Sequence, residues 1–420
     1  MFKKTVLDSG ITVVTEAHRY QRSVCVGAFI GIGTRDESLK NVGICHFVEH
    51  MVFKGTKNRS TNEIARAIEE VGGDLNAFTT REYTCFHTLS LKDDLELDIE
   101  VLGDLVVNAR FNQRDFDLEK KVVLQEVSMT EDTPEEYIFD LFFEKIYGKA
   151  SLGWPILGTK ESLEALKRSD LMKFYKERYC GKNIIVAAAG ALDHDTVVEM
   201  VEKSFHLGKR SSKKITKLPQ RKKPRWVPVR EVIRKEGEQT HILVGFEGVS
   251  FTSPKRFEAF VLNAWMGGGM SSKLYQSIRE KKGLAYTVYS NLTTFTDCGT
   301  LSIYAATEGK SVAAVMEAIH HDIKDLKRKK LNPRSLELFK QQVRGGILLG
   351  ADDMENRMSS LGVNEMTFGE YMAVDTVVEG IDKVTASDVR ALAHELLNPD
   401  KMAVLVMGDV DTAKTKKAIS

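Results

Sequence analysis

The feature of this sequence that most constrains its fold is a repeated helix-and-strand pattern. Residues 169–190 read SDLMKFYKERYCGKNIIVAAAG, and residues 387–408 read SDVRALAHELLNPDKMAVLVMG. Both segments start with Ser-Asp, continue as an amphipathic helix and end in an apolar strand closed by Gly after the same number of residues. We expect Ser169 and Ser387 to cap these helices. The repeat predicts an α+β fold with two similar domains, each a mainly antiparallel sheet packed with helices.

The boundary between the two domains is expected in a basic linker, residues 209–229. The stretch is rich in Lys and Arg, contains three prolines and has no acidic residue, which is typical of an exposed connection. The predicted domains are therefore residues 1–208 and 230–420, and a chain of 420 residues is long enough for both. A basic run can also bind nucleic acid, but the formal net charge of +1 favours a solvated linker and no nucleic-acid partner.

Composition and cysteine content indicate the cellular compartment in which the protein is expected. The five cysteines are an odd number without a C-x-x-C pair, which indicates free thiols in a reducing environment. No run of 18 apolar residues occurs, so we expect neither a transmembrane helix nor a membrane partner. The first 18 residues alternate like a strand and lack the pattern of a signal or transit peptide. These features predict a cytoplasmic protein.

The chemistry is concentrated in the segment His46-Phe47-Val48-Glu49-His50. Two histidines four residues apart on a helix project from one face and can bind a single Zn²⁺. Glu49 borders that face, where it can take a proton from water without being a ligand. The alternative is a surface helix with two exposed histidines. The apolar neighbours of the motif disfavour this alternative, because so apolar a helix should be largely buried. Buried histidines beside a carboxylate then require a partner.

A third ligand is sought in the helix predicted at about 115–130. One face with helical spacing combines two carboxylates with three valines: Glu119, Val122, Val123, Glu126 and Val127. Carboxylates on an apolar face are costly unless they are paired or bind metal. An alternative buried face uses Leu118, Val122 and Val123 and leaves both glutamates at its edge. The pattern alone does not decide between them.

Four motifs in this order resemble the pitrilysin/insulinase family of inverted (H-x-x-E-H) zinc peptidases. They are GICHFVEHMVFKGT, LNAFTTREYT, the pair Glu119 and Glu126, and GGGMSSKLYQSIREKKGLAYTVYS. The resemblance covers essentially the whole chain and is strongest to bacterial members similar to the mitochondrial processing peptidase β subunit.

This resemblance implies the rest of the metal site. The family's third ligand is a Glu that follows the second His by 76 residues, which is Glu126 here, and a supporting acid lies seven positions earlier, which is Glu119. The implied site holds one Zn²⁺ per chain on His46, His50 and Glu126. Two His and one Glu leave a coordination position open for water, as in catalytic zinc sites. Glu49 is then the general base.

The resemblance also implies how a peptide is held. Asn76 and Ala77 match an edge-strand pair that aligns the substrate. Arg279 and Tyr286 match an Arg-x6-Tyr pair that binds substrate and polarises the scissile carbonyl. Such a hydroxyl donates a hydrogen bond to the developing oxyanion.

The family resemblance implies an assembly as well. Two-domain halves face each other as a clamshell around a chamber, and this chain supplies one half. We therefore expect a homodimer that hydrolyses short peptides or unfolded polypeptides. Two alternatives are the zinc-bearing subunit of a heterodimer and a catalytically silent scaffold of the same fold. The presence of both the zinc motif and the Arg279/Tyr286 pair in one chain favours the homodimeric enzyme.

The remaining histidines are assigned other roles. His87 is expected to be a strand or core residue, and His194, His206 and His241 are expected to be solvated. His320 and His321 are expected to form a surface pair on a helix.

Overall fold

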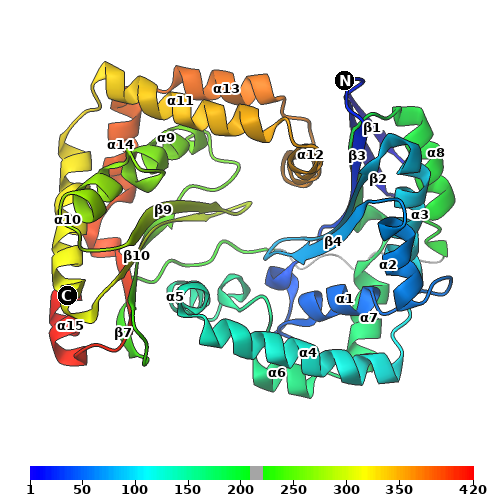
Figure 1. Cartoon of the computed structure of the whole chain (residues 1–420), viewed down its shortest axis with the longest axis horizontal. Coiled ribbons are helices and arrows are strands. Elements are labelled where there is room, and N and C mark those ends of the chain that lie inside the picture. Colours follow the sequence, from blue (N-terminus) through cyan, green and yellow to red (C-terminus); the bar gives the residue numbers. More distant parts are fainter. Residues whose placement is uncertain (209–220) are drawn as a thin grey trace. The chain divides into compact units, whose positions relative to one another are not determined.

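The computed structural model describes residues 1–208 and 221–420, which contacts divide into two compact units (Figure 1). Unit 1 comprises Met1–Met129, Trp154–Arg221 and Gly350–Met372. Unit 2 comprises Thr130–Gly153, Lys222–Leu349 and Ala373–Ser420. Most of the expected linker, residues 209–220, lies outside the described part of the chain.

Unit 1 is built on a six-stranded sheet with the order β1-β2-β6-β3-β5-β4. Strand β6 runs parallel to β2 and antiparallel to β3, and the other neighbours are antiparallel. Its strands are β1 (Phe2–Val6), β2 (Thr12–Ala17), β3 (Ser23–Ile30), β4 (Asp74–Thr79), β5 (Thr84–Leu91) and β6 (Ile184–Gly190). Its helices are α1 (Ile44–Val52), α2 (Thr61–Glu69), α3 (Leu95–Asn108), most of α4 (Gln113–Asp132), α6 (Lys160–Ala165), α7 (Arg168–Arg178), α8 (His194–Ser204) and α12 (Met354–Phe368).

Unit 2 is built on a five-stranded sheet with the order β7-β11-β8-β10-β9. Its strands are β7 (Arg230–Arg234), β8 (Thr240–Gly248), β9 (Thr287–Thr294), β10 (Gly299–Thr307) and β11 (Ala403–Gly408). Its helices are α5 (Pro134–Tyr147), α9 (Arg256–Gly267), the π-helical turn η7 (Tyr275–Glu280), α10 (Val312–Arg328), α11 (Pro333–Gly350), α13 (Val374–Lys383), α14 (Ala386–Leu396), the 3₁₀ turn η9 (Pro399–Lys401) and α15 (Thr412–Ile419).

The two sheets share one topology, which confirms two similar α+β domains. In unit 2, β11 runs parallel to β7 and antiparallel to β8, as β6 does between β2 and β3 in unit 1. The remaining neighbours follow in the same order, and β1 is the additional strand of unit 1. The repeated sequence segments form the equivalent pairs α7–β6 and α14–β11.

The helix caps predicted for these repeats are wrong. Helix α14 begins two residues earlier than expected, because Thr385 accepts from the backbone N–H of Asp388 and the Asp388 carboxylate accepts from the N–H of Thr385. In α7 the Asp170 carboxylate accepts from the backbone N–H of Lys167 in the same way. Ser169 and Ser387 lie within the first helical turn, so the Asp after each Ser is the capping acid.

Each sheet is covered on both faces. In unit 1, helices α1, α3, α7 and α8 contribute to the larger apolar core on one face, and α12 covers the other through Met354, Met358 and Leu361. In unit 2, helices α9, α10 and α14 cover one face, and α5 covers the other. Figure 1 shows α12 beside the strands of unit 1 and α9, α10 and α14 beside those of unit 2.

Helices α5 and α12 therefore depart from the expected division at residues 209–229. Helix α5 precedes that linker in the chain yet packs on β8 and β11, whereas α12 follows it yet packs on β2, β3 and β6. A glycine in a central strand makes room for each helix. A Cβ on Gly27 would lie 2.2 Å from Sδ of Met358, and a Cβ on Gly245 would lie 2.4 Å from Cζ of Phe142.

Residues 222–229, nearly all of the described part of the expected linker, belong to unit 2 and pack against its core. Trp226 packs on Phe142 and Tyr147 of α5, with ring centroids 6.5 and 6.2 Å away, and its Nε1 donates to the carbonyl of Lys401 at 2.8 Å. An apolar ring in a basic stretch thus joins the core of unit 2, which composition alone does not indicate.

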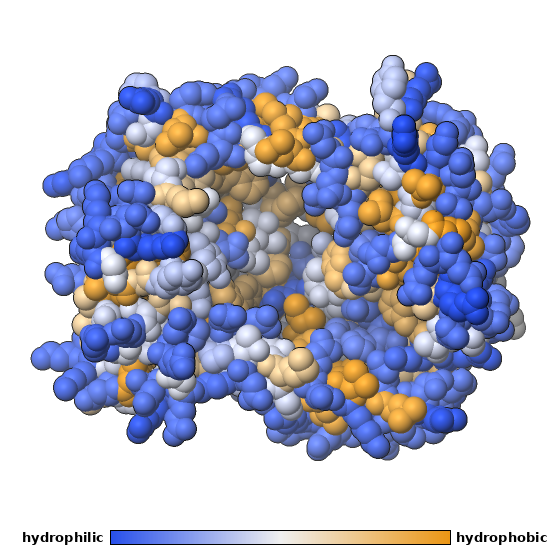
Figure 2. Space-filling model, viewed as in Figure 1, coloured by the Kyte–Doolittle hydropathy of each residue, from blue (hydrophilic) through white to orange (hydrophobic). Residues whose placement is uncertain are grey.

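No helix among the described residues is long and apolar enough to cross a bilayer. The face of the molecule in Figure 2 is largely hydrophilic, with apolar residues in small separate groups.

Candidate metal centre

Helix α1 is anchored at its start by a buried acid. The backbone N–H groups of Gly43 and Cys45 each donate to the Glu37 carboxylate at 2.8 Å. Burial raises the pKa of Glu37 to about 8. Gly43 adopts φ 89°, and a Cβ there would lie 2.7 Å from Cα of Gly158, so the turn into α1 requires glycine.

The H-x-x-E-H motif lies on α1, as its spacing predicts, and three donor atoms converge there. Nε2 of His46 lies 3.2 Å from Nε2 of His50. The Glu126 carboxylate, from α4, lies 3.7 Å from Nε2 of His46 and 3.4 Å from Nε2 of His50. Within residues 1–208 and 221–420, these three residues form the one group of His, Cys, Asp or Glu side chains close enough to share a metal ion.

These separations fit a tetrahedral ion. With Zn–ligand distances of about 2.0–2.1 Å, adjacent ligands of a tetrahedral zinc are about 3.3–3.4 Å apart. The observed 3.2, 3.4 and 3.7 Å lie around that value. Two imidazoles and one carboxylate are also a donor set that suits zinc, and they leave a fourth position open.

The two histidines are held in different electrostatic states. Burial, followed by the proximity of His50, lowers the pKa of His46 to about 4, so its imidazole is neutral near pH 7. Burial also disfavours a charged His50, but hydrogen bonds to Glu119 and Glu126 outweigh it and raise the pKa of His50 to about 9. Hydrogen bonding to His50 is in turn the main cause that lowers the pKa of Glu126. The two carboxylates thus favour a positive charge at His50.

Glu119 fixes the orientation of His50 through the ring nitrogen that points away from the other two donors. Nδ1 of His50 lies 2.9 Å from Oε1 of Glu119, so Nδ1–H donates to this carboxylate and Nε2 faces the other two donors. Oε2 of Glu119 lies 2.7 Å from Nζ of Lys54. Burial opposes ionisation of Glu119, but its bonds to His50 and Lys54 lower its pKa. The carboxylate is therefore ionised and bridges a lysine and the histidine.

Glu49 faces a neighbouring strand. Oε2 of Glu49 accepts from the hydroxyl of Thr79, the last residue of β4, at 2.5 Å. Burial raises the pKa of Glu49 although this hydrogen bond opposes the shift. A half-buried carboxylate with a raised pKa beside a metal-ligand cluster has the properties of a general base.

The buried face of α4 decides between the two alternatives left open by the sequence. Phe116, Glu119, Val123 and Val127 are buried, whereas Leu118 and Val122 are about half exposed (52% and 48%). Glu126 lies at the edge of this face with its side chain 39% exposed. Both carboxylates therefore face α1. The alternative in which the buried face of α4 runs through Leu118 is wrong.

Asn76 and Ala77 lie on β4, which is an edge strand of the unit 1 sheet. The side chain of Asn76 is exposed, and its Oδ1 accepts from the backbone N–H of Ala77 at 2.8 Å. Since Thr79 of the same strand contacts Glu49, β4 leads directly to the candidate centre. An edge strand presents unpaired backbone groups that an extended peptide can join.

Arg279 and Tyr286 belong to unit 2, where the structure brings them together. The Arg279 guanidinium lies 5.2 Å from the ring centroid of Tyr286 and 4.7 Å from that of Tyr275. The side chain of Tyr286 is 75% exposed. Arg279 lies in η7, and π-helical turns are frequent at functional sites.

Two of the other histidines differ from expectation. His194 is buried, and its ring nitrogens contact the hydroxyls of Thr5 and Thr15 at 2.8 and 2.9 Å. His241 is also buried, with Nδ1 2.7 Å from the hydroxyl of Tyr304. Neighbouring strands supply these partners, which a single sequence does not reveal. His87 is a buried strand residue and His206, His320 and His321 are exposed, as expected.

Three further supporting residues are not predicted from the sequence: Glu37, Lys54 and Thr79. Lys54 follows His50 by four residues, a spacing that could have pointed to the same face. Glu37 and Thr79 lie in other segments and contact α1 only through the tertiary fold.

Comparison with known proteins defines the class to which this fold and site belong. The model of the insulinase family (peptidase family M16) matches residues 12–160, and that of the peptidase M16 inactive domain matches residues 165–343. A protein of Mycobacterium leprae named an uncharacterized zinc protease is 39% identical over 415 residues, covering 98% of this chain and 93% of the relative. A Bacillus subtilis protein with the same description is 35% identical over 407 residues, covering 97% and 98%.

The fold is also found in a solved structure. A protease from Helicobacter pylori is similar with a TM-score of 0.90 at 20% identity, covering 97% of this chain and 99% of that one. The chain belongs to the insulinase family, peptidase family M16. The candidate ligands all lie in the first matched region, and the second region matches the domain described as inactive.

Proposed function

We propose that this protein is a zinc metalloendopeptidase that hydrolyses short peptides or unfolded polypeptides. The observation that carries the proposal is the convergence of His46, His50 and Glu126 at separations that suit one zinc ion, beside Glu49. The zinc-protease names of the relatives support the choice of metal.

The residues present divide the chemistry among themselves. His46, His50 and Glu126 would hold one zinc per chain, and zinc supplies Lewis acidity that activates water and polarises the peptide carbonyl. Glu49 would take the proton from the attacking water and deliver it to the leaving amine. Its contact with Thr79 holds the carboxylate beside the motif and leaves one oxygen for this transfer.

Glu119 and Lys54 would act through His50. The Glu119 carboxylate keeps the proton of His50 on Nδ1, so Nε2 presents its lone pair to the metal position. Lys54 supplies the positive charge that stabilises a buried carboxylate. Neither residue needs to touch the substrate.

Substrate would be held as an added strand along β4, next to Asn76 and Ala77. Tyr286 would donate a hydrogen bond to the developing oxyanion, and Arg279 would bind the substrate backbone beside it. We place these groups in a chamber enclosed by two copies of the chain, with the zinc of one copy and the Arg279/Tyr286 pair of the other at one site. A cytoplasmic location is part of the proposal, since an odd number of cysteines without a C-x-x-C pair does not suggest a disulfide framework.

Metal analysis combined with two variants tests the proposal. The purified protein should contain one zinc per chain and cleave unstructured peptides. Glu49→Gln should keep its zinc but lose activity by about 10²–10⁴-fold, because it removes a base and not a ligand. Glu126→Gln should lose both zinc and activity. The absence of stoichiometric zinc, or near-normal turnover by Glu49→Gln, would refute it.

A further inference from the structure

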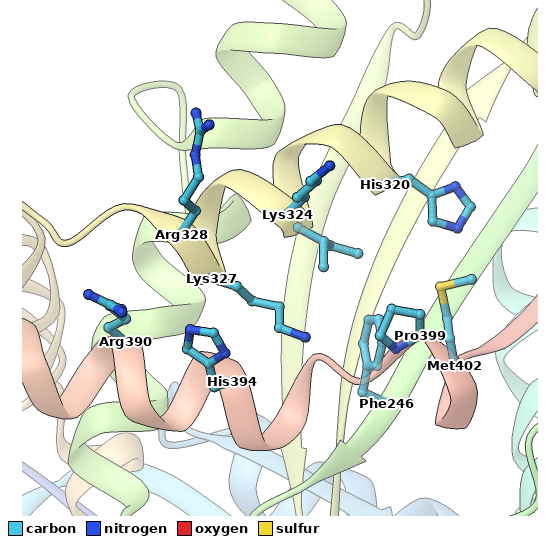
Figure 3. Close-up of a pocket in the computed structure, with 10 residues that line it drawn as sticks. Phe246, His320, Lys324, Lys327, Arg328, Arg390, His394, Pro399 and Met402 are labelled. Atoms are coloured by element: carbon cyan, nitrogen blue, oxygen red, sulfur yellow. The ribbon is translucent and has the colours of Figure 1, made fainter.

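Unit 2 contains a pocket of about 600 Å³ between α10 and α14, but its lining does not form one binding site. Figure 3 shows the basic side chains of Lys327 and Arg390 extending toward opposite ends of the pocket, and the ring of Phe246 is fully buried. The groups with a further role lie in unit 1, beside the candidate metal centre.

Four charged side chains form a buried network in unit 1: Arg35, Asp36, Glu82 and Arg221. Nη1 of Arg35 donates to Oε1 of Glu82 at 2.7 Å. The side chains of Arg35 and Asp36 are only 2% and 1% exposed. Buried charges of this kind depend on their partners, because an uncompensated charge is costly away from water.

Arg221, the first described residue of the expected linker, bonds two separate segments. Its Nε donates to Oδ1 of Asp36 at 3.0 Å, and its Nη2 donates to Oδ2 at 2.7 Å. Nη2 also donates to the carbonyls of Gly31 at 3.4 Å and Glu82 at 2.5 Å. Only a planar guanidinium offers several donors in this fixed geometry.

The first of these segments anchors α1. Asp36 is followed directly by Glu37, whose carboxylate accepts from the backbone N–H groups of Gly43 and Cys45. Oδ2 of Asp36 also accepts from the N–H of Gly33 at 3.0 Å, which fixes the turn before Glu37. A displaced Asp36 would therefore move the residue that holds the first turn of the motif helix.

The second segment leads to the candidate general base. The turn that contains Glu82 joins β4 to β5 and begins directly after Thr79, whose hydroxyl donates to Glu49 at 2.5 Å. The backbone N–H of Arg35 donates to the carbonyl of Arg81 at 2.9 Å, so the two segments are also joined to each other.

We propose that Arg221 is a positioning residue for the candidate metal centre. It holds the α1 anchor at Asp36 and the β4–β5 turn at Glu82 in one arrangement, and so acts on α1 through the first segment and on Glu49 through the second. This role rests on the proposed function, in which Glu49 is the general base. A residue in a stretch that the sequence predicts to be solvated thus supports the chemistry.

Steady-state kinetics with an unstructured peptide test this role. Arg221→Met removes the guanidinium and keeps an apolar stem. Zinc content and KM should change little, whereas kcat should fall at least about tenfold, because a shift of about 1 Å in a reacting group can cost on the order of 10²-fold. Arg225→Met is the matched control. Arg225 lies in the same stretch, is exposed and has neither an ion pair nor a side-chain hydrogen bond within the described ranges, so its replacement should leave kcat unchanged.

Chemical rescue separates positioning from stability. Arg221→Ala leaves room for a free guanidinium ion beside Asp36, and millimolar guanidinium should restore part of the lost kcat. Urea has a similar shape but no charge and should restore none. Both compounds destabilise folded proteins, so a gain in kcat does not reflect higher stability. Equal responses to the two compounds would contradict the role of Arg221.

Hydrogen exchange measures the same coupling without peptidase activity. Backbone amides of residues 43–47 and 79–83 should exchange at least about tenfold faster in Arg221→Met than in the wild type, and at the wild-type rate in Arg225→Met. If Arg221→Met does not fold, Asp36→Asn/Arg221→Met removes both charges of this contact and takes its place. Wild-type kcat in the folded variant, or unchanged exchange in both segments, would overturn the role. A wild-type protein without zinc and activity would refute the proposed function, and the exchange rates would still decide whether Arg221 holds the two segments.

Discussion

Three partners from outside the H-x-x-E-H motif hold its helix and its side chains in place. Glu37 bonds the first turn of α1, Glu119 bonds His50, and Thr79 bonds Glu49. Each contact fixes one orientation that the motif alone leaves free. The functional geometry therefore depends on residues that are neither ligands nor reactants.

Lys54 offers the sharpest test of this support. Lys54→Gln removes the cation that lies 2.7 Å from the buried Glu119 carboxylate, so Glu119 should hold His50 less firmly. We expect zinc affinity or turnover to fall about 10–100-fold, the range for partners of metal ligands. Zinc affinity measured by competition with a chelator, together with kcat and KM, checks this.

Lys57→Gln is the matched control for Lys54. Lys57 is exposed and follows Lys54 by three residues, so Lys57→Gln should leave zinc affinity and turnover unchanged. If Lys54→Gln matched this control in zinc affinity and turnover, the Lys54–Glu119 pair would have no part in the site.

At the scale of residues, the sequence predicts what is local and leaves open what is not. The spacing of His46, Glu49 and His50 places them on one helix, because helix geometry fixes that relation. Glu126 lies on a second helix, and the apolar pattern of α4 permits two buried faces. Only family resemblance singled Glu126 out, and its pairing with α1 depends on the tertiary fold.

At the scale of elements, the exchange of α5 and α12 could not be read from the sequence. Apolar periodicity shows that each helix has a buried face but not which sheet receives it. The α7–β6 and α14–β11 pairs were predictable, because each is a contiguous segment that occurs twice. The expected division at the linker assigned every residue to its own half of the chain, and contacts assign residues 130–153 and 350–372 to the other.

Gly27 tests the packing of α12. Gly27→Val should destabilise the protein by about 1–3 kcal/mol, because its side chain would overlap Met358. Gly31→Ala is the control, since the nearest atom to a Cβ there is 3.7 Å away. Denaturant unfolding measures both. Equal stability of Gly27→Val and the wild type would mean that α12 does not pack closely against β3 at this position.

Asp98 in α3 gives a pH-dependent prediction. It is fully buried, its Oδ2 accepts from Ser90 at 2.6 Å, and burial raises its pKa to about 7. Because the folded state binds the proton more tightly than the unfolded state, ionisation of Asp98 removes stability as the pH rises from about 4 to 7. Asp98→Asn should therefore gain stability relative to the wild type at pH 8, by on the order of a few kcal/mol, and gain less at pH 5.

Asp104, on the same helix, is the matched control for Asp98. Its carboxylate accepts from Thr56, Asn58, Arg59 and Asn108, so Asp104→Asn should destabilise the protein at both pH values. Melting temperatures of the two variants across this range provide the measurement. A difference between Asp98→Asn and the wild type that does not change with pH would contradict the assignment.

At the scale of the whole molecule, the candidate chemistry is divided between two units of one design. Unit 1 carries the metal-ligand cluster and β4, whereas unit 2 carries Arg279 and Tyr286. Among the described residues, unit 2 contains no second cluster able to hold a metal. In the proposed function, unit 1 would therefore carry out hydrolysis and unit 2 would help to bind the substrate.

The proposed dimer makes a prediction about mixed assemblies. A two-fold axis would place unit 2 of one copy against unit 1 of the other, so each site would take its zinc and its Tyr286 from different chains. A Glu49→Gln chain and a Tyr286→Phe chain should each be nearly inactive as homodimers. After subunit exchange, one site of the mixed dimer would pair an intact Glu49 with an intact Tyr286.

Activity should then return to about a quarter of the wild-type level at equal mixing, because half of the dimers are mixed and each mixed dimer has one intact site of two. Labelled chains establish exchange independently, and adding Glu49→Gln/Tyr286→Phe chains in place of either partner should restore nothing. Verified exchange without recovery would show that each chain completes its own site.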